Sequence, residues 1–224
     1  MPKTNFDLVK QAEKFLEMKV GYVWGTFGQV LTEKLLQQKL KQYPSGVGNY
    51  IDFIRKTWLN KRTCDCIGLI KSCLWFDGKD YKYNAAQDIS ADMSFNRAKE
   101  KGTMETMPEI PGICVWKKGH IGVYIGNGWV IEAAGTKRGV VKTPLEGRGS
   151  TAWTHWLKHP FIQYVEVKPT PTFLTLSVNG VDYKIDNFKN IDGSLFVGLR
   201  EILTDLGYKN ISYDGENLKV SATK

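Results

Sequence analysis

The chain has 224 residues, of which 42% are hydrophobic and 12% aromatic, as in folded globular proteins. This composition excludes a disordered chain, and the length allows one ordinary domain together with a small one. The formal net charge is +8; six basic and seven acidic residues lie from Pro169 onward, so the first 168 residues carry about +9. A surface excess of this kind attracts polyanions such as nucleic acid, an anionic membrane or anionic cell-wall polymers, or it only increases solubility.

Helices are predicted in the first part of the chain. Apolar residues recur at helical spacing over about 5–18, with a cap at Thr4 or Asn5. GYVWGTFG is predicted to be a glycine-rich loop. A polar helix follows over about 31–42, YPSGVGN interrupts it, and YIDFIRKTWL predicts another short helix.

A mostly buried helix is predicted from Cys66 to the break at Asp77-Gly78, and a polar helix near 86–101. Strand patterns follow in ICVWK, HIGVYIG, WVIEAA and FIQYVEV. Asn127-Gly128 joins the second and third as a hairpin. Helices followed by strands predict an α+β fold, with helices packed on a small antiparallel sheet.

A second, small domain is predicted at the C-terminus. KPTPT forms a stiff linker over 168–172, which separates a domain of residues 1–167 from one of residues 173–224. The latter contains a hairpin around Asn179-Gly180, a helix in VGLREILTDLG and a second hairpin in KNISYDGENLKVSA. The pattern predicts a ββαββ unit.

The four cysteines are expected to be reduced thiols. The first twenty residues are charged throughout and lack the apolar core of a signal peptide, so disulfides are not expected. Zinc is disfavoured because Cys64 and Cys66 are separated by one residue only, and we expect neither metal nor cofactor. No stretch approaches the roughly 18 apolar residues of a membrane span.

Asp65-Cys66 is the most informative pair of residues. Cys66 begins a buried helix, where the partial positive charge of the helix N-terminus lowers the pKa of a thiol. Backbone N–H groups at such a position can also stabilise an oxyanion. The simpler interpretation is that Cys66 packs as a small hydrophobic residue.

A base for Cys66 is predicted at His120, which opens a strand after a glycine turn. His155 and His159 lie in an aromatic stretch and are expected to serve packing or the surface. Glu132 lies among apolar residues on the neighbouring strand, where its carboxylate can accept a hydrogen bond from His120 and fix the imidazole tautomer. Alternatively, Glu132 points to solvent on the outer face of the sheet.

The order of three motifs resembles that of the NlpC-type cell-wall peptidases: YVWG, then Asp-Cys-x-Gly-Leu from Asp65, then GHIGVYIGNG. The resemblance covers about 150 residues and implies a papain-like fold with Cys66 as nucleophile and His120 as base. Glu132 matches the third polar residue of the family, and Tyr22 a tyrosine beside the nucleophile that assists the oxyanion or the substrate. Asp65 matches a residue near the substrate's free amine.

Two departures from the family bear on specificity. Ile67 replaces the usual serine after the nucleophile, which puts a requirement for a free peptide amine in doubt. The segment before Cys66 is long and is expected to form a wall of the cleft. The C-terminal tail resembles the small stalk-type domain named for copper amine oxidases, which implies wall attachment or homodimerisation and no copper role.

These features predict a bacteriolytic cysteine peptidase that hydrolyses an amide bond in the stem peptide of bacterial peptidoglycan. Because no export signal is evident, we expect a phage-type endolysin held in the host cytoplasm until its release to the wall. The alternatives are an N-acetylmuramoyl-L-alanine amidase with the same Cys66–His120–Glu132 triad, a non-catalytic wall-binding protein and a lipid acyltransferase. Nucleic-acid binding is the weakest of the alternative functions, because the basic residues are scattered without a motif.

Overall fold

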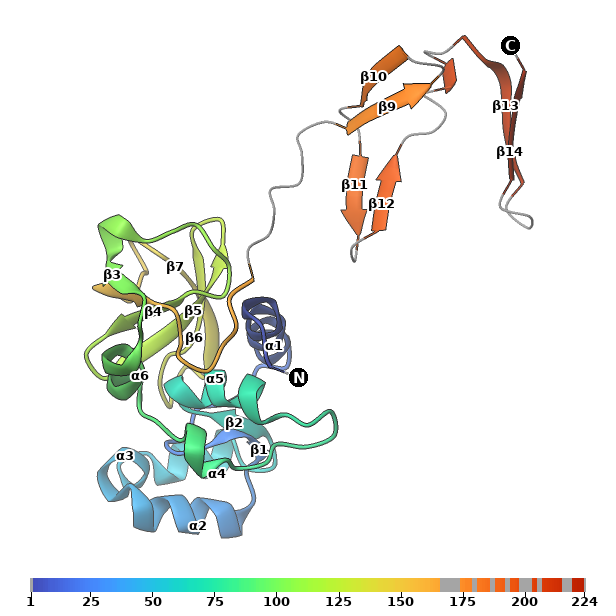
Figure 1. Ribbon diagram of the computed structural model, residues 1–224. Coiled ribbons are helices and arrows are strands. Elements are labelled where there is room, and N and C mark those ends of the chain that lie inside the picture. The colour runs from blue at the N-terminus through green and yellow to red at the C-terminus, as the bar shows by residue number, and fades with distance from the viewer. Residues whose placement is uncertain are drawn as a thin grey trace. The chain divides into compact units, whose positions relative to one another are not determined.

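The computed structural model divides the chain into two compact units, Met1–Glu166 and Val167–Lys224 (Figure 1). The predicted linker at 168–172 lies outside the described residues, as does most of the helix predicted in VGLREILTDLG. The predicted domain boundary therefore stays a prediction. The structure describes residues 2–165, 174–178, 181–185, 188–191, 194–197, 203–204, 207–214 and 219–223.

Helix α1 (Asn5–Glu17) begins where the sequence predicts it. Thr4 caps it through a capping box with Asp7. The buried face of the helix carries Leu8, Ala12 and Phe15, which are fully buried. These side chains join the main hydrophobic core between the helices and the sheet.

The segment between α1 and the Cys66 helix forms an insertion, residues 31–61, on a short hairpin. Its helices are α2 (Glu33–Gln42), α3 (Pro44–Gly48) and α4 (Ile51–Thr57). The interruption predicted at YPSGVGN is thus a short helix, begun by a proline in its first turn. The insertion has a hydrophobic cluster made of Leu31, Leu36, Val47, Ile54 and Trp58, which Val23 of the preceding loop completes.

The glycine-rich loop prediction for GYVWGTFG is wrong over its last residues. Strand β1 (Phe27–Val30) pairs antiparallel with β2 (Arg62–Cys64) at both ends of the insertion. The backbone N–H of Cys64 donates to the Gly21 carbonyl, and that of Asp65 donates to the Thr26 carbonyl. These bonds hold the Tyr22–Thr26 loop against the residues that precede Cys66.

Helix α5 (Cys66–Trp75) is almost entirely buried, as its apolar sequence predicts. It approaches the Tyr22–Thr26 loop so closely that a Cβ atom at Gly68 would overlap the Thr26 carbonyl oxygen. Helix α6 (Ala91–Arg97) is shorter than predicted, because Ser90 caps its start and a separate 3-10 turn occupies Ala85–Gln87.

A six-stranded antiparallel sheet packs against α1 and α5, which confirms the α+β fold (Figure 1). The strand order is β3-β8-β4-β5-β6-β7. The hairpin of β5 and β6 turns at Asn127-Gly128 as predicted, and Val123 pairs with Ile131. The strands are β3 (Lys101–Thr103), β4 (Cys114–Lys117), β5 (His120–Gly126), β6 (Trp129–Ala133), β7 (Val140–Pro144) and β8 (His155–Leu157).

The predicted last strand, FIQYVEV, is wrong. Among its described residues, 161–165, only Gln163 forms a bridge, with Thr4, and this part of the segment runs beside the start of α1. Asn5 holds it by donating its N–H to the Gln163 carbonyl and accepting from the Val165 N–H. The sheet is completed instead by β8, which lies within the stretch assigned to packing or surface.

The second unit contains three hairpins among its described residues. Two were predicted, β9 (Leu174–Val178) with β10 (Val181–Ile185) and β13 (Lys209–Asp214) with β14 (Lys219–Thr223). The ββαββ prediction is wrong in strand number, because β11 (Phe188–Ile191) and β12 (Ser194–Val197) form a further hairpin. Asp192-Gly193 separates these two strands in the sequence and is a typical hairpin turn pair.

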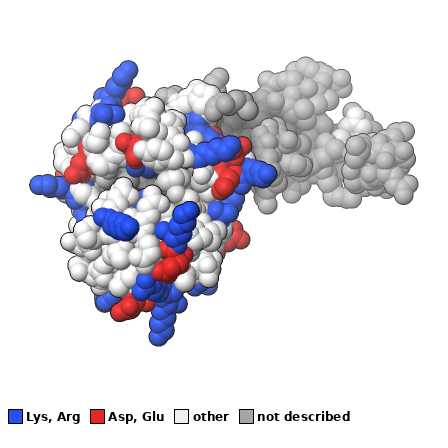
Figure 2. All heavy atoms as spheres, turned by 90° about the horizontal axis from the view of Figure 1, so that it is seen from below, with Lys and Arg blue, Asp and Glu red and all other residues white. Residues whose placement is uncertain are grey.

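The charged side chains are distributed over the surface of the first unit. Figure 2 shows Lys and Arg spread across the face seen from below, with Asp and Glu between them. This distribution fits the scattered basic residues of the sequence. Within the described part of the chain, no helix has the length and apolar character needed to cross a bilayer.

Candidate active site

Cys66 is the first residue of α5, and Asp65 is its N-cap. One Asp65 carboxylate oxygen accepts from the Gly68 N–H at 2.7 Å, and the other accepts from the Gly25 N–H at 2.7 Å. Asp65 therefore fixes both the helix start and the adjoining loop. Its predicted contact with substrate stays a prediction, since both oxygens already have backbone partners.

The start of β5 lies next to the Cys66 sulfur. The Cys66 thiol donates to the Gly119 carbonyl oxygen, with 4.0 Å between sulfur and oxygen. The backbone N–H of Ile121 also lies near the sulfur and lowers the pKa of the thiol. His120 stands between these two residues. Within residues 2–165, however, no hydrogen bond joins the Cys66 thiol to the His120 imidazole. Catalytic hydrogen bonds in free enzymes are often long and tighten only with substrate.

His120 and Glu132 form the predicted hydrogen bond. His120 Nε2 donates to Glu132 Oε2 at 2.6 Å, and the Glu132 side chain is 1% exposed. Side chains alternate along a strand, so the Val123–Ile131 pairing puts Glu132 on the same face as Gly122 and His120. The solvent-facing alternative for Glu132 is therefore wrong, although its catalytic role stays a prediction.

Glu132 is held as a carboxylate by three donors. Burial raises its pKa, but hydrogen bonds from His120, Thr151 and Thr143 outweigh this effect and lower the pKa below the usual value. Thr143 Oγ1 donates at 2.8 Å, and Thr151 Oγ1 donates to the same oxygen. A carboxylate can only accept, so the His120 proton resides on Nε2 and Nδ1 is the nitrogen that can take a proton.

Trp153 stacks on the His120 imidazole, with ring centroids 5.3 Å apart and planes 7° from parallel. The Trp153 side chain is 7% exposed, so its position is set by packing. Stacking and the Glu132 hydrogen bond together fix both the plane and the rotation of the imidazole. No sequence pattern predicts this role for Trp153, because the residue lies in an irregular segment before β8.

The Cys66 thiol is protonated in the free site. Burial raises the pKa of Cys66 to about 12, and the Asp65 carboxylate adds to this. Backbone N–H groups of Ile67, Ile121 and Cys66 act in the opposite direction but do not compensate. The N–H groups at the start of α5 lower this pKa, as expected, but burial outweighs them and the net shift is upward. Attack by Cys66 therefore requires a base.

Tyr22 lies beside Cys66 and is 5% exposed. Burial raises the pKa of the Tyr22 hydroxyl above its usual value, and the nearness of Cys66 and Asp65 contributes. The hydroxyl is therefore a neutral donor at physiological pH. The structure brings Tyr22, Asp65 and Cys66 together, as the sequence predicts.

A cavity of about 710 Å³ gives access to Cys66. The insertion forms one wall and α6 with the β4–β5 turn another. The long segment before Cys66 thus forms a wall of the cleft, as predicted. Residues of the wall that bear charge are Lys39, Asp65, Lys71, Asp88 and Asp92.

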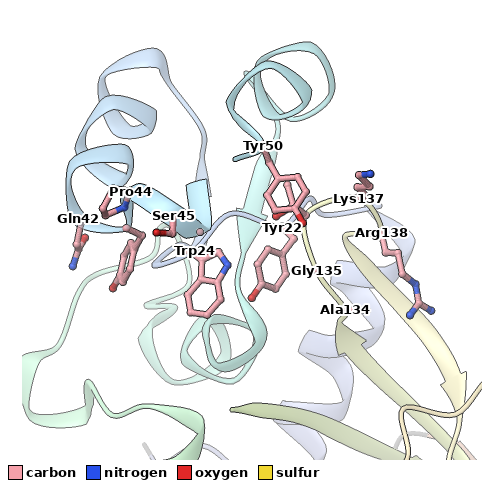
Figure 3. A pocket seen from close by; sticks show the side chains of 13 residues that line it. Tyr22, Trp24, Gln42, Pro44, Ser45, Tyr50, Ala134, Gly135, Lys137 and Arg138 are labelled. Carbon is pink, nitrogen blue, oxygen red and sulfur yellow. The ribbon is translucent and has the colours of Figure 1, made fainter. Parts of the chain in front are cut away.

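A second cavity, of about 860 Å³, adjoins the first (Figure 3). The rings of Tyr22, Trp24 and Tyr50 lie between α3 and the loop that carries Lys137 and Arg138. Tyr22, Trp24, Gln42 and Tyr43 line both cavities, so they lie at the boundary between them.

Sequence reasoning missed Asp92, which supports the turn before His120. One Asp92 oxygen accepts from the Gly119 N–H at 2.7 Å and from Trp116 Nε1 at 3.1 Å. An acidic residue in the first turn of a short helix carries no signal for such a contact. His159 is buried, and its Nε2 lies 3.3 Å from Ser94 Oγ, in agreement with its predicted packing role.

All four cysteines are free and buried. Among the described residues, no group of three or more His, Cys, Asp or Glu side chains is arranged to hold a metal ion. A thiol and an imidazole can together support acyl transfer, with the thiol as nucleophile and the imidazole as base.

No protein-family model and no curated protein matches the sequence. The P60 domain of a Mycobacterium avium subspecies paratuberculosis antigen is similar to 71% of the chain over 98% of its own, with 19% identity and a TM-score of 0.39. The peptidoglycan hydrolase RipB of Mycobacterium tuberculosis is similar to 71% of the chain over 67% of its own length, with 20% identity and a TM-score of 0.38. The NlpC/p60 domain of the peptidoglycan hydrolase SagA is similar to 69% of the chain over 98% of its own length, with 16% identity and a TM-score of 0.38. Values this low decide nothing about function.

Proposed function

We propose that this protein is a cysteine-dependent hydrolase of an amide bond in the stem peptide of bacterial peptidoglycan. One observation carries the proposal: the Cys66 sulfur contacts the turn that begins β5, where His120 is oriented by a buried Glu132. A thiol, an imidazole and a carboxylate in this order are the parts of a nucleophilic triad.

The reaction begins with proton transfer from Cys66 to His120 Nδ1. The thiolate then attacks the substrate carbonyl carbon, and the oxyanion accepts hydrogen bonds from the Cys66 N–H and the Tyr22 hydroxyl. The imidazolium returns its proton to the leaving amine as the amide C–N bond breaks. Water, activated by the same imidazole, hydrolyses the thioester and regenerates the thiol.

The substrate class rests on the three motifs that resemble the NlpC-type peptidases. The net charge of about +9 over the first 168 residues also favours a substrate embedded in an anionic wall. We include in the proposal the endolysin role and the attachment or dimerisation role of the C-terminal unit. Expression inside a bacterium with and without a pore-forming lysis protein tests the first, and sedimentation of the full chain tests the second.

Loss of turbidity of purified cell walls tests the activity. Cys66→Ala should abolish it, whereas the control Cys73→Ala, in the same helix, should keep it. Undiminished lysis by a folded Cys66→Ala protein would remove the nucleophile assignment. Mass spectrometry of the fragments distinguishes a cut within the stem peptide from an amidase cut at its first residue.

A non-catalytic wall-binding protein is the second candidate, and the raised pKa of Cys66 is the observation that favours it. Alkylation by iodoacetamide separates the two. A catalytic Cys66 should react at pH 7 much faster than Cys73, and the difference should disappear in His120→Ala. Equal rates would support the wall-binding protein.

A further inference from the structure

Lys39 is the most unusual charged residue of the cleft. It lies on α2, in the insertion, and its side chain lines the same cavity as Cys66. Lys39 is only 8% exposed, whereas lysine side chains are rarely buried without a partner. Lys34 on the same helix is exposed.

The Lys39 ammonium has one hydrogen bond among the described residues, to Gln42 Oε1 at 3.0 Å. The Tyr43 ring adds a cation–π contact at 5.9 Å. Within residues 2–165, no carboxylate lies within 4.0 Å of Lys39 Nζ. An ammonium has three donors, so the group is left short of partners.

The acidic residues of the cleft are already engaged. Asp88 pairs with Lys71 at 2.5 Å and accepts from the Tyr83 hydroxyl. Asp65 accepts two backbone N–H groups, and Asp92 accepts from the β4–β5 turn. Burial accordingly lowers the pKa of Lys39. The negative charges of Asp65 and Asp88 act in the opposite direction but do not outweigh burial. The cavity therefore lacks a direct counter-ion for its buried cation.

The position of Lys39 Nζ ties it to the nucleophile. A Cβ atom added at Gly25 would lie 3.1 Å from Nζ, so the ammonium sits over the Gly25 backbone. The Gly25 N–H donates to Asp65, which caps the helix that Cys66 begins. The cation thus lies beside a loop residue that is hydrogen-bonded to the cap of α5.

We propose that Lys39 binds a free carboxylate of the peptide substrate close to the scissile amide. The inference deepens the proposed function and rests on it. A bound carboxylate would supply the missing counter-ion and accept the unused donors in a site shielded from water. A substrate amine at this place would meet a like charge, and Ile67 offers it no hydrogen bond.

Three synthetic stem peptides test this site. The first has all carboxylates free, the second carries an amide at the α-carboxylate of its second residue, and the third an amide at its C-terminus. Binding is measured by calorimetry on the full-length Cys66→Ala protein, in which nothing is hydrolysed. At least one amide should bind about 10- to 100-fold more weakly than the free acid, the range for a hydrogen bond to a charged group.

Lys39→Met in the Cys66→Ala background should bind acid and amide alike. It should also fold, because an apolar side chain of similar length replaces a buried charge. Lys39→Arg should keep part of the preference, and the exposed control Lys34→Met all of it. Equal binding of the three peptides to Cys66→Ala, no binding of any, or a preference that survives Lys39→Met would overturn the inference. The proposed function fails separately, if the wild-type protein hydrolyses neither peptides nor walls.

Discussion

Replacing Glu132 by Gln tests the orientation of His120 most directly. The substitution keeps the volume of a side chain that is 1% exposed. Its carbonyl can still accept from Thr143 and Thr151, but its amide nitrogen then faces His120 Nε2. Since two donors cannot share a hydrogen bond, the imidazole proton moves to Nδ1. The nitrogen required as base is then already protonated.

We expect kcat to fall about 10⁴-fold in Glu132→Gln, the scale of a tautomer error in a nucleophilic triad. This corresponds to about 5 kcal/mol in the activation barrier. The free energy of unfolding should fall by only about 1–2 kcal/mol, because charge-assisted hydrogen bonds become neutral ones. Activity and stability are therefore affected very unequally.

The assay combines initial rates on a defined stem peptide with urea unfolding of the same preparations. Thr143→Val is the matched control, since it removes one bond to Glu132 and leaves the His120 bond in place. It should cost similar stability but less than about tenfold in kcat, since the imidazole keeps its tautomer. A Glu132→Gln enzyme within about threefold of wild type would refute the tautomer argument.

Three further predictions follow from the packing. Burial lowers the pKa of His159 to about 3, so below about pH 6.5 the unfolded chain binds a proton that the folded protein does not. The free energy of unfolding should therefore fall by a few kcal/mol as the pH falls from 6.5 to 3. His159→Gln should flatten this pH dependence in urea titrations, and an unchanged slope would contradict the argument. Asp92→Ala should lower kcat about tenfold with little change in Tm, because the turn before His120 loses its support; equal losses in Asp80→Ala would point to a nonspecific effect. Gly25→Ala should lower the free energy of unfolding by more than about 1 kcal/mol, because φ is +75° and the Cβ meets Tyr43; an unchanged urea midpoint would contradict this.

The parts of the site that follow from local patterns were predictable. The apolar helix from Cys66, the Asn127-Gly128 hairpin and the alternation that allows Glu132 to face His120 are all short-range features. They need no knowledge of the rest of the chain.

Other parts depend on contacts between distant segments. Trp153 and Thr151 reach His120 and Glu132 from an irregular segment, and the burial of Lys39 results from the packing of the insertion over Gly25. FIQYVEV has strand composition but is bound by Asn5 at the start of α1, which a propensity scale does not contain. Short strands such as β1 and β3 form because a partner lies beside them.

The separate hydrophobic cluster of the insertion has a consequence for how substrate range can change. Helices α2 to α4 pack around Leu36, Val47 and Ile54, apart from the core beneath the sheet. Exchanges on their cleft-facing side, including Lys39, therefore leave the main core beneath the sheet unchanged. Under the proposed function, a different helical segment grafted between β1 and β2 would give Cys66 and His120 a new set of acceptable peptides.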